Sequence, residues 1–179
     1  MTLTIILEGS NNVGKTTISE KLQRWFDHLK LNYVYFHDSD LYESVIDNNN
    51  QFSLDELIQE RNDLYKEMRE EYDIILLDRS FLSTIVYNLD LRDVSYLDTY
   101  IEKELLNICE TPRDNLIIFI LVRDSNEILS KDYIKLSHKL LLERHIDSNI
   151  IYTNEDLEHT LERIKTDVFD DILLQTEEE

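Results

Sequence analysis

The 179-residue chain has the length of one globular domain, and 42% of its residues are hydrophobic, which is enough to form a core. Its formal net charge of −20 argues against nucleic-acid binding, because that role needs a basic surface. A single cysteine argues against a disulfide framework, no segment is apolar enough to span a membrane, and no signal-peptide pattern opens the chain, so we expect a cytoplasmic protein.

The first predicted elements are a strand at residues 3–7 and a helix at 15–30, and the loop between them holds the only two glycines of the chain. This loop fits the phosphate-binding pattern G-x-x-x-x-G-K-[ST] at every required position. It reads Gly9-Ser10-Asn11-Asn12-Val13-Gly14-Lys15-Thr16. Its backbone N–H groups and the start of the helix would form an anion site. A chance match in a strand–turn–helix connection is the alternative, and the correct flanking elements weigh against it.

Three side chains of this segment have predicted roles. Lys15 would reach the β- and γ-phosphates of a nucleoside triphosphate, and the Thr16 hydroxyl would bind Mg²⁺. Thr17 would add a further phosphate contact. The expected ligands are therefore a nucleoside triphosphate and Mg²⁺.

The second predicted strand, at residues 33–36, is followed by two carboxylates, Asp38 and Asp40. Either could act in a reaction at the carboxyl ends of the strands, or could cap a loop. A polar connector at 47–50, predicted to be mobile, and a helix at 54–71 come next.

The third predicted strand, at residues 74–77, runs directly into Asp78, Arg79 and Ser80. An apolar strand that ends in Asp is the expected partner of a phosphate loop, and Asp78 would lie near the Mg²⁺, directly or through water. Arg79 would direct its planar guanidinium at phosphate oxygens. The alternative is an Asp–Arg pair that caps the strand, with Asp78 or Ser80 opening the helix predicted at 82–89.

The remaining predicted elements continue the alternation of helices and strands, at residues 95–110, 116–122, 125–144, 150–152 and 155–174. The whole order predicts a three-layer α/β fold of one domain, residues 1–179, with a five-stranded parallel sheet and helices on both faces. Lys131 and Lys135 would share a helical face, where they could neutralise a transferring phosphoryl group or simply be solvated.

A resemblance to the thymidylate kinase family lies in the segment after the third strand, which reads Asp78-Arg79-Ser80-Phe81-Leu82-Ser83-Thr84-Ile85-Val86-Tyr87. The family signature has Asp-Arg, a variable pair, an apolar residue, Ser-Thr or Ser-Ser, and an aromatic residue three positions later. Residues 5–9, Ile-Ile-Leu-Glu-Gly, are similar to the family's Phe/Ile-Glu-Gly, and residues 58–61 are similar to its Ala-Ala-Asp-Arg.

The resemblance implies a P-loop kinase that phosphorylates dTMP with ATP and Mg²⁺ and that forms a homodimer. It implies that Arg79 holds the acceptor phosphate and that Arg61 faces the acceptor nucleotide. Ser83 and Tyr87 would line the acceptor pocket. The alternatives are a surface ion pair for Arg61 and an ordinary core position for Tyr87.

The chain departs from the family pattern in the loop and in the lid. Asn11 stands where the family has an acidic residue, and Asn12 stands where it has Arg or Gly. Asn tolerates left-handed backbone, so the loop geometry can survive. The lid, within about 123–139, is shortened, and catalysis would then use a lid cation such as Lys131.

Two other functions remain open from the sequence. The related deoxynucleoside kinases carry Glu-Arg-Ser where this chain has Asp78, Arg79 and Ser80, and they use a carboxylate base near Asp38 or Asp40 for the sugar hydroxyl. A monophosphate acceptor needs no such base. A nucleotide-binding module without catalytic activity is the second alternative, because the loop and the lid are altered. The favoured function is transfer of the γ-phosphoryl group to a deoxynucleoside monophosphate, with dTMP first.

Overall fold

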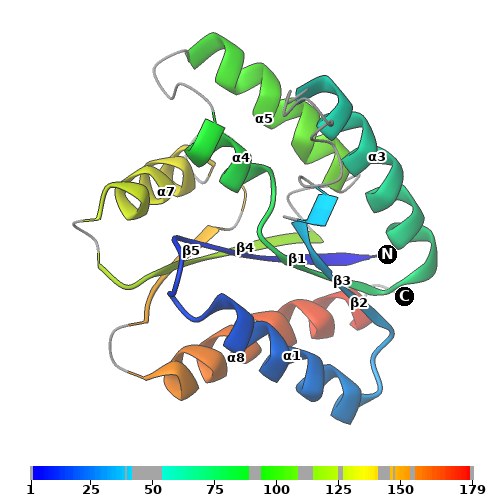
Figure 1. The fold of residues 1–179 in the computed structure, drawn as a ribbon. Helices are drawn as coiled ribbons and strands as arrows, with labels where there is room; N and C mark the ends of the chain where they lie inside the picture. Colours follow the sequence, from blue (N-terminus) through cyan, green and yellow to red (C-terminus); the bar gives the residue numbers. More distant parts are fainter. Residues whose placement is uncertain are drawn as a thin grey trace.

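Five parallel strands form one sheet in the order β2-β3-β1-β4-β5 (Figure 1). Their bounds are β1 Leu3–Glu8, β2 Tyr33–His37, β3 Ile74–Asp78, β4 Leu116–Val122 and β5 Ser148–Tyr152. The computed structural model describes residues 2–38, 40–41, 54–88, 94–108, 115–124, 127–140, 146, 148–153 and 156–177. The predicted connector at 47–50 lies outside these described residues.

Helices cover both faces of the sheet, as Figure 1 shows. On one face lie α1 Lys15–Leu29 and α8 Leu157–Glu177. The other face carries α3 Leu54–Glu71, α4 Phe81–Asn88, α5 Val94–Ile108 and α7 Ile128–Lys139. The predicted three-layer α/β architecture with a five-stranded parallel sheet is therefore confirmed. None of the helices among the described residues combines the length and the apolar character needed to cross a membrane.

Local interactions explain where several helices begin and end. Helix α1 stops at Leu29 because Lys30 adopts a left-handed conformation, with φ of 57°, and its N–H bonds back to the carbonyls of Phe26 and Asp27. Helix α8 starts two residues later than predicted because the Asp156 carboxylate accepts a hydrogen bond from the N–H of Glu158, at 2.9 Å. Asp156 therefore acts as the N-cap of this helix.

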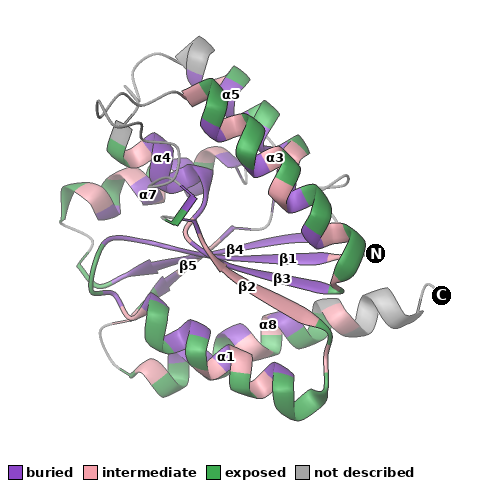
Figure 2. Ribbon diagram, turned by 45° about the vertical axis from the view of Figure 1, so that its right-hand side comes forward, coloured by how far each residue is buried: buried purple, intermediate pink, exposed green. Residues whose placement is uncertain are grey.

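The side-chain alternation along the strands divides the core into two clusters. In β1, Ile5 and Leu7 join the cluster under α1 and α8, whereas Ile6 joins the cluster under α3, α5 and α7. Strands β1, β3 and β4 are buried along their whole length, and β2 at the edge is only half-buried (Figure 2). Because successive residues point to opposite faces, Glu8 shares the face of Ile6 and points toward α4 and α7.

Candidate active site

The loop between β1 and α1 has the backbone geometry that its glycines predict. Gly9 has a φ of 136° and Gly14, the N-cap of α1, has a φ of 96°. A Cβ at Gly9 would lie 2.2 Å from the backbone oxygen of Leu121, so the loop is seated directly against β4. Asn12 is also left-handed, with φ of 62°, and it therefore fills a position where most residues would be strained.

The side chain of Lys15 folds back onto this loop and does not extend into solvent. Its Nζ donates to the carbonyl oxygens of Gly9, at 2.9 Å, and of Ser10, at 2.7 Å. Burial lowers the pKa of Lys15 to about 8, and the positive charge of Arg79 adds to this effect. The ammonium group is thus held against the loop that the sequence predicts to bind phosphate, by two carbonyl oxygens of that loop.

Asp78 meets the start of α1 because β1 and β3 are adjacent parallel strands. Its Oδ2 lies 3.5 Å from the hydroxyls of Thr16 and Tyr35, and 3.8 Å from His37 Nε2. Asp78 is fully buried, and its Oδ1 has no hydrogen-bond partner among the residues that the structure describes. The structure therefore brings together Thr16 and Asp78, the two residues that the sequence predicts to hold Mg²⁺.

These two oxygen-bearing side chains fit Mg²⁺, which favours one or two protein oxygens together with phosphates and waters. The unpaired, buried Oδ1 of Asp78 is the observation that supports this fit. The part of the chain that the structure describes contains no cluster of three or more His, Cys, Asp or Glu residues suited to a metal. A cation here would therefore rely on the nucleotide for much of its coordination.

Arg79 connects the phosphate loop to α4. Its backbone is left-handed, with φ of 74°, and its guanidinium donates to Ser83 Oγ at 3.1 Å and to Asn11 Oδ1 at 2.5 Å. The guanidinium carbon lies 5.6 Å from the ring centre of Tyr87, which is 44% exposed and is therefore not a core aromatic. Arg79, Ser83 and Tyr87, all predicted on the acceptor side, are thus brought together beside the loop.

A buried polar network lies behind Arg79. Glu8 Oε1 accepts hydrogen bonds from Ser80 Oγ at 2.7 Å and from the Ser83 N–H at 3.2 Å, and its Oε2 accepts from Ser83 Oγ at 2.8 Å. Burial raises the pKa of Glu8, and the bonds from both serines oppose that rise. Ser80 also accepts from the N–H of Leu82, so it caps α4 as the alternative interpretation proposed.

The phenol of Tyr133 completes this network from α7. Its oxygen lies 2.8 Å from Ser83 Oγ, and the side chain is fully buried. Sequence reasoning missed Tyr133, because its spacing from Leu136 and Leu140 is that of an ordinary apolar helix face. Nothing in the sequence separated its hydroxyl from the core around it.

Arg61 differs from both sequence-based interpretations. Its side chain is fully buried, so it is not part of a surface ion pair. The guanidinium binds both oxygens of Asp38 and also donates to Glu104 Oε1 at 2.8 Å. The hydroxyls of Tyr100 and Thr84 accept from it at 3.1 and 2.9 Å.

These contacts use all five N–H groups that an arginine carries, so in this structure Arg61 has none left for an acceptor nucleotide. Asp38 is buried and also accepts from Tyr65, at 3.1 Å. The structure therefore places Arg61 and Asp38 in an internal ion-pair network, behind the loop region rather than in an open pocket. The spacing of residues in the sequence does not reveal this network, because the partners of Arg61 come from separate helices and strands.

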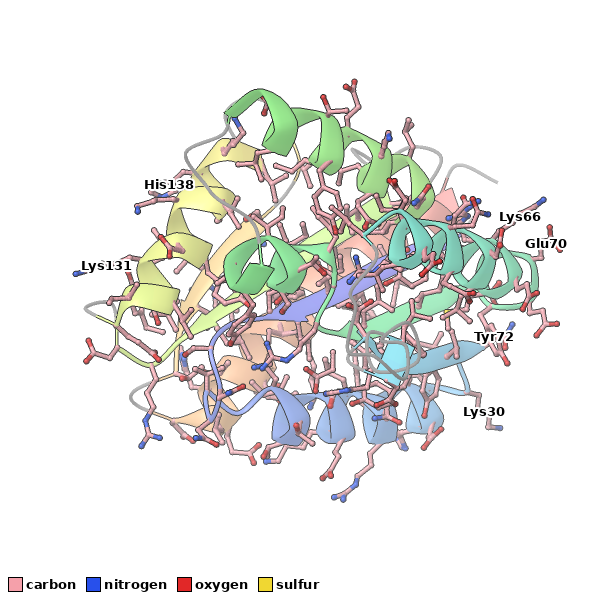
Figure 3. The ribbon with its side chains drawn as sticks, turned by 45° about the horizontal axis from the view of Figure 1, so that its top comes forward. Lys30, Lys66, Glu70, Tyr72, Lys131 and His138 are labelled. Atoms are coloured by element: carbon pink, nitrogen blue, oxygen red, sulfur yellow. The ribbon has the colours of Figure 1, made fainter. Side chains whose placement is uncertain are left out.

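The predicted lid residues divide between two environments. Lys131 is exposed on α7 and points outward in Figure 3, and Lys135 pairs with Asp132 at 3.1 Å. By contrast, Glu127, just before α7, accepts from Ser10 Oγ at 2.8 Å and so contacts the phosphate loop. The start of the predicted lid is therefore packed on the loop, whereas Lys131 is not.

A cavity of about 460 Å³ lies beside the loop. It is lined by Asn12, Val13, Gly14, Arg123, Thr153, Asp156 and Leu157. Of these, Thr153, Asp156 and Leu157 follow β5 and were not singled out from the sequence. Asn12, Val13 and Gly14 belong to the phosphate loop, so the cavity borders that loop.

The parallel sheet, the glycine-containing loop at the end of its central strand and the Asp–Arg pair after the neighbouring strand define a P-loop protein of the α/β class. No protein-family model matches the chain.

Two comparisons define the relationship further. The chain is 30% identical over 126 residues to a protein of Acidianus bottle-shaped virus (isolate Italy/Pozzuoli) named "Putative thymidylate kinase", and the match covers 69% of this chain and 73% of that protein. The crystal structure of thymidylate kinase from Ehrlichia chaffeensis shares the fold, with a TM-score of 0.63, 20% identity, and coverage of 92% of this chain and 98% of that chain. The protein belongs to the thymidylate kinase family.

Proposed function

We propose that this protein is a nucleotide kinase that transfers the γ-phosphoryl group of ATP to a deoxynucleoside monophosphate, with dTMP as the first candidate. One observation carries the proposal. Arg79 donates a hydrogen bond to Asn11 of the phosphate loop, so the cation assigned to the acceptor and the loop assigned to the donor are in contact. Two phosphate groups bound at these places would be neighbours.

In the proposed reaction, an oxygen of the acceptor phosphate attacks the γ-phosphorus and forms a new P–O bond. The bond between the γ-phosphorus and the bridging oxygen breaks, and ADP leaves with its electron pair. The acceptor phosphate is already a nucleophile, so no protein base is needed. Most of the rate enhancement in such transfers comes from positioning and charge neutralisation.

The residues of the chain would divide this work. The loop N–H groups and Lys15 would hold the donor phosphates, and Arg79 would hold the acceptor phosphate with Tyr87 beside it. Thr16 and Asp78 would hold Mg²⁺, which when bound supplies charge neutralisation at the donor phosphates. These assignments rest on the contacts that each side chain makes around the loop.

The lid cation and the donor base also have candidates. Arg123 lines the cavity beside the loop, whereas Lys131 points outward, so Arg123 is the better-placed lid cation. The same cavity would accept the base of ATP. The family resemblance also supports a homodimer, which sedimentation velocity would test.

A deoxynucleoside kinase is the second candidate, and the structure favours it less. A nucleoside acceptor needs a free carboxylate base, but both oxygens of Asp38 are bound by the buried Arg61. Asp40 is exposed, 3.6 Å from His37 Nδ1, and is the only one of the two that is accessible to solvent.

The test is a phosphotransfer assay with ATP and Mg²⁺ against nucleosides and nucleoside monophosphates, with Lys15→Ala as the control. Transfer to a monophosphate that is lost in Lys15→Ala supports the proposal and identifies the base. Transfer only to nucleosides would contradict the proposal and would identify the protein as a deoxynucleoside kinase. ATP binding without transfer to any acceptor would favour the alternative of a nucleotide-binding module without catalytic activity.

A further inference from the structure

The hydroxyl of Ser83 is the meeting point of three side chains. It contacts Glu8 Oε2 at 2.8 Å, Arg79 at 3.1 Å and the Tyr133 phenol at 2.8 Å. A serine hydroxyl has one hydrogen to donate and two lone pairs to accept. All three capacities are therefore in use.

The direction of each hydrogen bond follows from this count. The guanidinium of Arg79 can only donate, so it takes one lone pair of Ser83. The Glu8 carboxylate accepts, so it takes the hydrogen of Ser83. The remaining lone pair must then receive the hydrogen of Tyr133, so the phenol donates. The three partners together fix the orientation of the Ser83 hydroxyl.

We propose that Tyr133 is a positioning residue, which acts through Ser83 to hold the guanidinium of Arg79 in the orientation that receives the acceptor phosphate. The inference rests on the proposed function for the identity of that acceptor. It assigns to α7 a part in acceptor binding that does not depend on any cation of the lid.

Burial makes this contact effective. Tyr133 is fully buried and Ser83 is 8% exposed, so water cannot readily replace the phenol as a donor. Arg79 itself is only half-buried, and Asn11 and Tyr87, which also contact its guanidinium, are both exposed. The Ser83 contact is therefore the best-shielded of these three contacts of the guanidinium. A displacement of α7 would move Tyr133 and, through Ser83, would change the position of the Arg79 guanidinium.

The first test compares Tyr133→Phe with Tyr33→Phe. Both variants lose one phenol hydroxyl, and Tyr33 donates to Asp27 at 3.0 Å on the opposite face of the sheet. We expect Tyr133→Phe to raise the KM for the monophosphate about fivefold, which corresponds to one net hydrogen bond. The KM for ATP stays unchanged, and Tyr33→Phe changes neither constant.

A double-mutant cycle tests whether Tyr133 acts on Arg79 through Ser83. If Tyr133 acts through Ser83, then Tyr133→Phe adds no further loss of acceptor affinity in a Ser83→Ala background. Additive losses, or an equal loss of ATP and acceptor affinity in Tyr133→Phe alone, would overturn the inference, because they indicate general destabilisation.

The second measurement does not depend on turnover. NMR relaxation of the Arg79 Nε–Hε group, identified by its absence in Arg79→Lys, should show a more mobile side chain in Tyr133→Phe than in the unmodified protein or in Tyr33→Phe. An equally rigid Arg79 in Tyr133→Phe contradicts the inference even if catalysis changes. If the unmodified protein phosphorylates no acceptor, the proposed function fails, and this measurement alone decides the role of Tyr133.

Discussion

Asn11 holds Arg79 with a neutral side chain, at the loop position where the sequence departs from the acidic residue of the family. The amide oxygen accepts from the guanidinium without cancelling its charge. Ser83, which also accepts a hydrogen bond from the guanidinium, is neutral as well. At the scale of single residues, this arrangement leaves the charge of Arg79 available for an anion.

We therefore expect Asn11→Asp to weaken acceptor binding. A carboxylate at this position would form an ion pair with Arg79 and compete with the acceptor phosphate, and one such partly exposed pair is worth about fivefold in affinity. Titration calorimetry with dTMP measures the change, and Asn11→Ala is the control that removes the contact without adding charge. Equal or tighter binding of dTMP to Asn11→Asp would show that Arg79 does not bind the acceptor phosphate.

Lys15 gives the nucleotide site a specific pH dependence. Burial lowers its pKa to about 8 in the free protein, with Arg79 adding to the shift and Glu8 and Asp78 opposing it. Bound phosphates favour the charged form, so above pH 8 the binding of ATP must take up a proton. We expect the affinity for ATP to fall by up to about tenfold per pH unit above that value.

The matching control is Lys15→Arg, whose guanidinium stays charged throughout this range. Its affinity for ATP should be nearly independent of pH between 7 and about 9.5, whatever its absolute value. Binding enthalpies measured by calorimetry in buffers of different ionisation enthalpy would also report the uptake of the proton directly. A pH profile of the same slope in both proteins would exclude Lys15 as the titrating group.

At the scale of the elements, the two glycines of the loop differ in what surrounds them. Gly9 lies against the backbone of β4, which cannot move independently of the sheet, whereas a Cβ at Gly14 would lie 2.7 Å from the flexible Leu157 side chain. Both have a positive φ. We expect Gly9→Ala to destabilise the fold by at least about 3 kcal/mol and Gly14→Ala by about 1–2 kcal/mol.

Urea unfolding of both variants measures this difference. In a Leu157→Ala background, Gly14→Ala should become less costly, because the contact is removed and only the backbone strain remains. No comparable relief exists for Gly9. Equal costs for the two substitutions would show that the loop moves away from β4 more easily than its packing indicates.

The secondary structure was predictable from the sequence because its signals are local. Strand β4 matches its predicted bounds at both ends, since Leu116–Val122 is one uninterrupted apolar run. Strand β3 extends one residue further, to Asp78, because both Leu7 and His37 pair with that residue. Helix α8 begins late because of a capping bond that a pattern of apolar residues does not contain.

In the candidate site, only the residues that belong to a sequence motif were predictable. The loop, Lys15, Thr16 and Asp78 belong to motifs whose spacing is set by chemistry, and the structure brings them together. The partners of Arg61 and Ser83 come from other elements, and each contact depends on how helices pack across one face of the sheet. Neither periodicity nor charge in the sequence indicates such a pairing.

At the scale of the whole molecule, the Arg61 network joins α3, α4 and α5 to the residue that follows β2. Two carboxylates, Asp38 and Glu104, share one guanidinium, and within the described part of the chain Glu104 Oε2 has no hydrogen-bond partner. We expect Arg61→Met to destabilise the protein by roughly 3–5 kcal/mol at pH 7, because it leaves two buried carboxylates without a countercharge.

The pH dependence of that loss follows from the carboxylates. Burial raises the pKa of Glu104, so its charged form costs stability as the pH rises from its ordinary value through the raised one. In Arg61→Met this cost is larger, and the variant should recover part of its stability when the pH is lowered toward 5. Adding Glu104→Gln should restore part of the stability at pH 7. If the loss of stability in Arg61→Met changed neither with pH nor with Glu104→Gln, its cause would be the loss of side-chain packing alone.

The position of β1 at the centre of the sheet has a consequence for synthesis of the chain. Its neighbours β3 and β4 are both encoded far downstream, and Gly9 is seated on Leu121, close to the end of β4. The phosphate loop therefore leaves the ribosome before β3 and β4, yet its shape is settled only when these two later strands have paired with β1. A nascent chain that ends before β4 carries every residue of the loop and has no surface to hold it in its nucleotide-binding form.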